Sequence, residues 1–165
     1  MRLQRKPLRG TCLPTAFAIV LDMPVVTVLA EIGHDGSAIV DPSLPEPLCR
    51  RGFHIQEVID VCLRHNSAVT PVELCPILSP RCDVEPREVF ADEAGWQRFA
   101  CAINGSRGVI EGASLRCCHA VAYGHGRIYD PDVGEYDYSP AACQAFGFVP
   151  ICAWRIDPIG ERTRE

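Results

Sequence analysis

The sequence has no long apolar run and no dense block of basic residues. Residues 13–21 form its longest apolar helix candidate, and Asp22 ends that stretch far short of membrane-spanning length. Asp22-Met23-Pro24 is also a poor small-residue cleavage site, which argues against a signal peptide. Basic residues gather only near the two ends and the net charge is −5, so nucleic acid is a poor candidate partner. We expect a cytoplasmic protein without membrane contact, with export by an unrevealed route as the alternative.

Repeats and low-complexity tracts are also missing, and the composition is not that of a disordered chain. The 165 residues suit one compact domain, and a hydrophobic content of 47% supplies an ordinary core. We predict a single domain over residues 1–165, with a helical part at about 10–106 and a sheet part at about 107–157.

Cysteine is abundant, but no paired C-x-x-C pattern of the kind that holds structural zinc is present. The ten cysteines do not indicate a disulfide miniprotein, because the chain is long enough to hold a core without bridges. Cys62, Cys101 and Cys152 stand within apolar periodic segments, where cysteine behaves as a small hydrophobe. We therefore expect mostly reduced, buried cysteines and no metal, with some disulfide bridges or a cysteine-rich metal site as alternatives.

The N-terminal part has helical periodicity. Pro14 fits only the first turn of a helix, which independently places the start of the first helix near Cys12. Pro24 can open the second helix, and Ser139 can cap a short one near the C-terminus. Helices are predicted over residues 12–22, 25–32, 54–66, 93–103 and 139–146.

The C-terminal part changes to the shorter period of strands. Gly124-His125-Gly126 is a hairpin turn between a strand that begins at His119 and one that ends at Asp130. An earlier strand contains Pro71, which favours a position at the edge of a sheet. Strands are predicted over residues 68–74, 108–112, 119–123, 127–130 and 149–156. Helices followed by a meander of strands indicate the α+β class.

Cys12 begins a buried helix, where unpaired N–H groups and the helix dipole favour the thiolate, the nucleophilic form. A thiol nucleophile needs a base, and the base needs an orienting acceptor. The antiparallel hairpin brings His119 and Asp130 to the same edge of the sheet. We predict Cys12 as the nucleophile, His119 as the base and Asp130 as its orienter, with Asp132 and Asp137 as fallback carboxylates.

An oxyanion formed at Cys12 needs hydrogen-bond donors. The backbone N–H of Cys12 can supply one, and a nearby side-chain amide can supply a second. Gln4 is the only glutamine before Cys12, so it is the predicted oxyanion residue.

These motifs resemble papain-like cysteine peptidases, and the small bacterial and phage branch related to bacteriocin-leader-processing peptidases looks most similar. The segments Gly10 to Leu21, Met23-Pro24-Val25 and His119 to Pro131 carry the resemblance, whereas residues 37–106 match no known pattern. The resemblance implies a papain-like fold in which N-terminal helices, the first carrying Cys12, pack on a C-terminal antiparallel sheet.

The resemblance also implies Cys12 as the nucleophile, His119 as general base and acid, and Asp130 as orienter. Papain-like enzymes usually carry the oxyanion glutamine about six residues before the cysteine, where this chain has Lys6, and Gln4 is displaced by two.

We predict a thiol hydrolase that acts on a peptide, protein or amide substrate through a Cys-His-Asp triad and needs no cofactor. Peptidases, deamidases, amidases and transferases share this triad, so the reaction within that group stays open, as does the oligomeric state. A catalytically silent binding or scaffold protein of the same fold is the main alternative, and a cysteine-rich metal-binding protein is the other.

Overall fold

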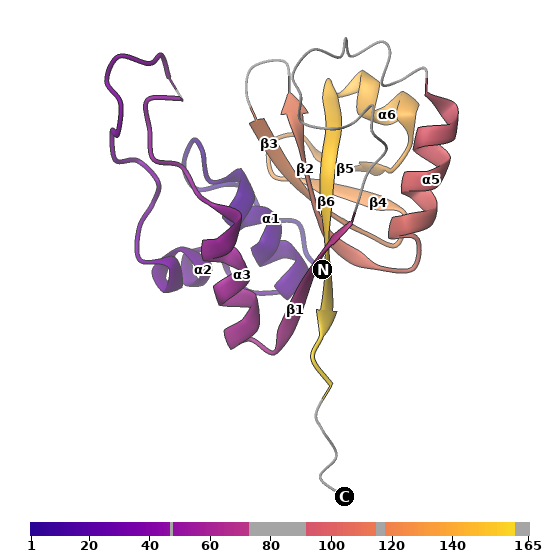
Figure 1. Cartoon of the computed structure of the whole chain (residues 1–165), viewed down its shortest axis with the longest axis horizontal. Helices are drawn as coiled ribbons and strands as arrows, with labels where there is room; N and C mark the ends of the chain where they lie inside the picture. The colour runs from indigo at the N-terminus through magenta and orange to yellow at the C-terminus, as the bar shows by residue number, and fades with distance from the viewer. Residues whose placement is uncertain (47, 73–91, 115–117, 161–165) are drawn as a thin grey trace, which may run out of the picture.

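The structure is a computed structural model that describes residues 1–46, 48–72, 92–114 and 118–160. Helices lie on both sides of a six-stranded antiparallel sheet (Figure 1). The helices are α1 (Cys12–Leu21), α2 (Val25–Ile32), α3 (Ile55–Arg64), α5 (Glu93–Ile103) and α6 (Pro140–Ala145). The strands are β1 (Ser67–Val72), β2 (Arg107–Ser114), β3 (Cys118–Gly124), β4 (Arg127–Asp130), β5 (Gly134–Asp137) and β6 (Phe148–Pro158).

The strand order across the sheet is β1-β6-β2-β3-β4-β5, and every neighbouring pair is antiparallel. Strand β6 lies between β1 and β2, so the strand that comes last in sequence pairs with the two that come first. Strand β1 stands at one edge, as the proline within it predicts. It enters the sheet from within the predicted helical part, between α3 and α5. The predicted α+β class with an antiparallel sheet is confirmed.

The sheet is covered on both faces because successive strand residues point to opposite sides. In β2, Val109 packs toward α1 and α3, whereas the next residue, Ile110, packs toward α5. The first core contains Leu13, Phe17, Val20, Val58, Ala122, Tyr129 and Ile156, among others. The second contains Trp96, Phe99, Val121, Ile128, Tyr136, Phe148 and Ala153, among others. The structure therefore has three layers, with the sheet in the middle.

Helix α1 is the central helix of the first core. All its residues from Leu13 to Val20 are buried, and the buried Thr15 hydroxyl donates to the Thr11 carbonyl at 2.6 Å. Asp22 ends the helix with a left-handed backbone at φ 57°. Across the described ranges, no single helix is both long and apolar enough to cross a membrane. Helices α1 and α2 reach that length and hydropathy only when taken together, and they are bent by 118° with respect to each other.

The hairpin that presents His119 and Asp130 forms as predicted. His125 and Gly126 take positive φ values of 55° and 74°, and β4 covers the four residues of the predicted return strand. Ser139 caps α6, since its hydroxyl accepts from the Ala142 N–H at 3.1 Å. Strand β5 was not predicted, because Tyr136 is the single apolar residue among its four and gives no alternating pattern.

The cysteines within the described residues are free thiols. Cys62 is fully buried, as predicted, and Cys152 is half-buried. The prediction for Cys101 was wrong: α5 turns Trp96 and Phe99 toward the sheet, and this leaves Cys101 on the exposed side of the helix. Three further cysteines lie outside the described residues: Cys75, Cys82 and Cys117.

Candidate active site

Cys12 is the first residue of α1, where the chain leaves a turn and enters the core. Gly10 makes that turn with a φ of 88°, a left-handed conformation that glycine adopts without strain. The Thr11 hydroxyl donates to the Leu8 carbonyl at 2.7 Å and so secures the chain before the helix. Thr11 and Leu13 on either side are buried, so Cys12 is a half-buried residue at the start of a buried helix.

His119 is held from two sides at the start of β3. The side chain is 7% exposed, and its ring meets the ring of Phe148 edge-on at a centroid distance of 5.9 Å. Its Nε2 atom lies 3.0 Å from Oδ1 of Asp130. The β3–β4 register explains this contact: Ala122 pairs with Tyr129, so Asp130 falls diagonally across from His119 on the same face.

Asp130 ends β4 and is buried, with an exposure of 3%. Besides facing His119, its Oδ1 accepts backbone N–H groups from Asp132 at 2.7 Å and Val133 at 3.3 Å. The turn that follows β4 therefore fixes the direction of the carboxylate. A buried carboxylate with this many donors is held as an anion.

The pKa values of this pair move apart. Burial by itself lowers the pKa of His119, but hydrogen bonds with Asp130 and Cys12 outweigh it and raise that pKa to about 10. Burial by itself raises the pKa of Asp130, but the bond with His119 and the backbone donors hold it below its usual range. At neutral pH the pair is therefore an imidazolium and a carboxylate.

The Cys12 side chain is the other group that acts on His119, since its interaction with the imidazole also raises the pKa of that ring. Because Asp130 takes Nε2, the ring atom that remains for the sulfur is Nδ1. Residues that stand more than 100 positions apart in the chain thus meet around one imidazole. The arrangement is chemically able to hold a thiolate beside an imidazolium whose far side is neutralised by a carboxylate.

Gln4 has a different position from these three. Its Nε2 donates to the Met23 carbonyl at 2.6 Å, and its Oε1 accepts from the Val25 N–H at 2.9 Å. Both bonds lie at the C-terminal end of α1, whereas Cys12 begins that helix. The carboxamide therefore ties the N-terminal segment to the start of α2. An oxyanion role for Gln4 stays a prediction.

The residues around His119 could offer ligands to a cation. One ligand atom each from His119, Asp130 and Asp132 lie within 4.8 Å of one another, and no described cysteine belongs to this group. Lys6, however, places its ammonium 2.6 Å from the Asp132 carboxylate, and the Arg5 guanidinium donates to the Asp132 carbonyl at 2.6 Å. A cation here would compete with a bound ammonium, which does not favour a metal centre.

Sequence reasoning missed two residues that lie beside His119, namely Gly112 and Phe148. Gly112 pairs with His119 across β2 and β3, and an added Cβ there would lie 2.7 Å from the Phe148 ring. The β2–β6 register also shifts between Glu111 and Gly112, which marks a bulge at this point. A glycine inside a strand pattern is the one signal that could have revealed this close approach. Phe148 offers no local signal, because its contact depends on the sheet order.

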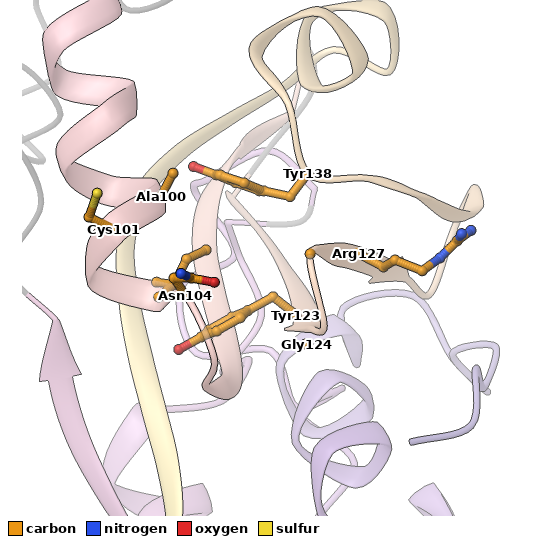
Figure 2. A pocket seen from close by; sticks show the side chains of 9 residues that line it. Ala100, Cys101, Asn104, Tyr123, Gly124, Arg127 and Tyr138 are labelled. Carbon is orange, nitrogen blue, oxygen red and sulfur yellow. The ribbon is translucent and has the colours of Figure 1, made fainter.

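A cavity of about 290 Å³ lies elsewhere, between the C-terminal end of α5 and the β3–β4 hairpin (Figure 2). Tyr123 and Tyr138 project toward α5 there, and the Arg127 side chain extends away from them. The cavity meets β3 at Tyr123 and Gly124, and even Tyr123 stands four residues or roughly 13 Å from His119 along the strand. It is therefore separate from the site at His119.

Solved structures of cysteine peptidase domains share the fold of this chain. The peptidase domain of Streptococcus ComA, a bifunctional ABC transporter involved in a quorum-sensing pathway, matches with a TM-score of 0.53 and 10% identity, over 95% of this chain and 98% of that one. A double-glycine motif protease from an AMS/PCAT transporter, solved with a leader peptide, matches with a TM-score of 0.53 and 12% identity, over 95% and 91%.

These two peptidase domains come from transporters and have a papain-like fold, so the predicted papain-like fold is confirmed. At this level of identity the likeness shows the fold alone. No model of a protein family matches the chain, and no curated protein does.

Proposed function

We propose that the protein is a thiol hydrolase that cleaves a peptide or amide bond with Cys12 as nucleophile, His119 as general acid and base, and Asp130 as the orienter of His119. The observation that supports this most strongly is the 3.0 Å contact between His119 and the buried Asp130, next to which Cys12 also acts to raise the pKa of His119. A helix-start thiol, an imidazole and a buried carboxylate in this order are the parts that thiol catalysis needs.

In the first half of the reaction, the Cys12 thiolate attacks the carbonyl carbon of the scissile bond. The carbonyl electron pair moves to oxygen, and the backbone N–H of Cys12 at the helix start stabilises the oxyanion. The C–N bond then breaks as the His119 imidazolium transfers its Nδ1 proton to the leaving nitrogen. The products are a free amine, a thioester on Cys12 and a neutral imidazole.

In the second half, the neutral His119 takes a proton from water as the water oxygen attacks the thioester carbon. The C–S bond breaks, the carboxylic acid leaves, and the Cys12 thiolate returns beside the re-formed imidazolium. Throughout, the bond from Nε2 to Asp130 keeps the ring in one orientation.

A peptide is the substrate class that we propose. The double-glycine motif protease of similar fold was solved with a leader peptide bound. A suitable substrate panel therefore contains peptides with an internal Gly-Gly pair, matched peptides in which Ala-Ala replaces that pair, and simple amides. Mass spectrometry of the products identifies the bond that breaks.

Alkylation by iodoacetamide tests the site without any knowledge of the substrate. We expect Cys12 to react at least about tenfold faster at pH 7 than the exposed Cys101, because an ordinary thiol is only a few per cent thiolate at that pH. His119→Ala should remove this advantage. His125→Asn, on the exposed hairpin turn, is the matched control and should leave the rate unchanged. A Cys12 rate equal to that of Cys101 in the unaltered protein contradicts the proposal.

The silent binding protein of the same fold is the second candidate, and the position of Gln4 favours it, because the side-chain amide expected at the oxyanion is bonded to Met23 and Val25. An activated ester such as p-nitrophenyl acetate separates the two candidates. A hydrolase releases nitrophenol in repeated turnovers, whereas a silent protein stops after one equivalent or shows no release at all.

A further inference from the structure

Two carboxylates, and not one, lie within reach of His119. Asp130 makes the 3.0 Å contact with Nε2, and a ligand atom of Asp132 lies within 4.8 Å of those of both residues. Asp130 is buried, whereas the Asp132 side chain is 38% exposed and stands on the turn that follows β4. A modest rotation of Asp132 would offer His119 a second anionic acceptor.

Lys6 occupies both oxygens of that second carboxylate. Its Nζ lies 2.6 Å from Oδ1 and 2.6 Å from Oδ2 of Asp132. Arg5 adds a bond of 2.6 Å from its guanidinium to the Asp132 carbonyl oxygen. The N-terminal segment thus holds the side chain and the backbone of the same residue, 126 and 127 positions away in the chain.

The backbone N–H of Asp132 connects this contact to the active-site pair. That N–H donates to Oδ1 of Asp130 at 2.7 Å, so the Asp132 main chain supports the orienting carboxylate while its side chain is turned to Lys6. If the side chain were released, it would compete with Asp130 for the Nε2 proton of an imidazolium, because charge-assisted bonds to carboxylates are strong. The ring would then turn, and Nδ1 would leave the Cys12 sulfur.

We propose that Lys6 is a positioning residue for the active-site histidine: by holding both carboxylate oxygens of Asp132, it prevents a competing acceptor from replacing Asp130 at His119. This inference rests on the proposed function, since it assigns Lys6 a part in aligning Cys12 and His119. Lys6 stands six residues before Cys12, and its ammonium is directed to the β4–β5 turn.

Four variants separate this role from that of an ordinary surface salt bridge: Lys6→Met, Lys6→Arg, Asp132→Asn, and Lys6→Met combined with Asp132→Asn. The readout is the rate at which iodoacetamide alkylates Cys12 at pH 7. We expect Lys6→Met to slow alkylation about two- to fivefold, the range that corresponds to a partly exposed ion pair. Lys6→Arg keeps the charge and should retain the rate.

The double variant is the decisive one. If Lys6 restrains a competing carboxylate, removing that carboxylate makes the lysine dispensable, so Asp132→Asn and the double variant should both alkylate at the original rate. If the salt bridge serves only to hold the turn together, Lys6→Met, Asp132→Asn and the double variant should be slowed equally, and that result overturns the proposal.

A spectroscopic readout follows His119 itself. The Nε2 proton of His119 should give a low-field NMR signal that shifts in Lys6→Met and returns in the double variant, because its acceptor changes and is then restored. An unchanged signal in Lys6→Met overturns the proposal, whatever the alkylation rate.

The outcome for Lys6 is distinguishable from that for the proposed function. If Cys12 labels slowly and His119→Ala has no effect, the hydrolase proposal fails. If Cys12 labels rapidly through His119 while Lys6→Met matches the unaltered protein, only the positioning role fails.

Discussion

Two buried polar regions of this protein differ in how their polar atoms are satisfied. At the start of β3, His119 and Asp130 bond to each other, and Asp130 takes two further backbone donors. On the face of the sheet toward α5 and α6, the Tyr136 and Tyr138 hydroxyls are buried without a hydrogen-bond partner among the described residues. Burial raises the pKa of both tyrosines, so they stay neutral.

The difference shows what each region contributes. A buried charge without a partner is strongly unfavourable, so the His119–Asp130 pair depends on every bond around it. A neutral hydroxyl without a partner is tolerated more easily, because the rest of its ring gains from apolar packing. Removing a polar group should therefore destabilise the first region and not the second.

The largest effect is expected for Asp130→Ala. The substitution leaves His119 buried without its carboxylate and removes the acceptor of two backbone donors in the turn. We expect the free energy of unfolding to fall by about 3 to 5 kcal/mol, measured by urea denaturation at pH 6. Asp137→Ala is the control, since that carboxylate is 82% exposed and its loss should change stability by less than about 0.5 kcal/mol. Equal losses in the two variants would contradict the comparison.

The second prediction, of a smaller effect, concerns how the stabilisation by the His119–Asp130 pair changes with pH. The folded pKa of His119, about 10, lies above its ordinary value of 6.5, so its stabilisation is full below pH 6.5 and declines as pH rises toward 10. The pKa of Asp130 is lowered, so its stabilisation is lost as pH falls below its ordinary value of 3.8.

The advantage of the unaltered protein over Asp130→Asn should therefore be greatest between about pH 4 and 6.5 and should shrink toward pH 10. Unfolding midpoints of both proteins across pH 4 to 10 measure it. A gap that stays constant, or widens above pH 6.5, would show that the pair is not charged in the folded state.

The smallest effect is expected for Tyr136→Phe, in the region toward α5 and α6. Deleting a buried hydroxyl that lacks a partner should leave the free energy of unfolding unchanged or raise it by about 1 kcal/mol. Tyr123→Phe is the matched control, because the Tyr123 hydroxyl lies 3.3 Å from Ser106 Oγ and its removal should cost about 0.5 to 1.5 kcal/mol. Thermal unfolding of both variants decides the matter, and a loss for Tyr136→Phe as large as that for Tyr123→Phe would contradict the comparison.

Local patterns predicted the elements that carry the candidate site. Pro14 indicated the first turn of α1 and hence the position of Cys12, and the turn around His125 indicated the β3–β4 pairing. Short or exposed features were harder to predict. Cys101 appears apolar in the sequence, but the direction of α5 places it outside, and β5 contains a single apolar residue.

The sequence by itself determined where Cys12, His119 and Asp130 stand within their elements, because capping, turn formation and strand pairing across a tight hairpin depend on residues close in the chain. Only the tertiary structure decided that Lys6 binds Asp132. It also directed the Gln4 carboxamide to the far end of α1. These contacts depend on the strand order and on the path of the N-terminal segment, so no local pattern of residues encodes them.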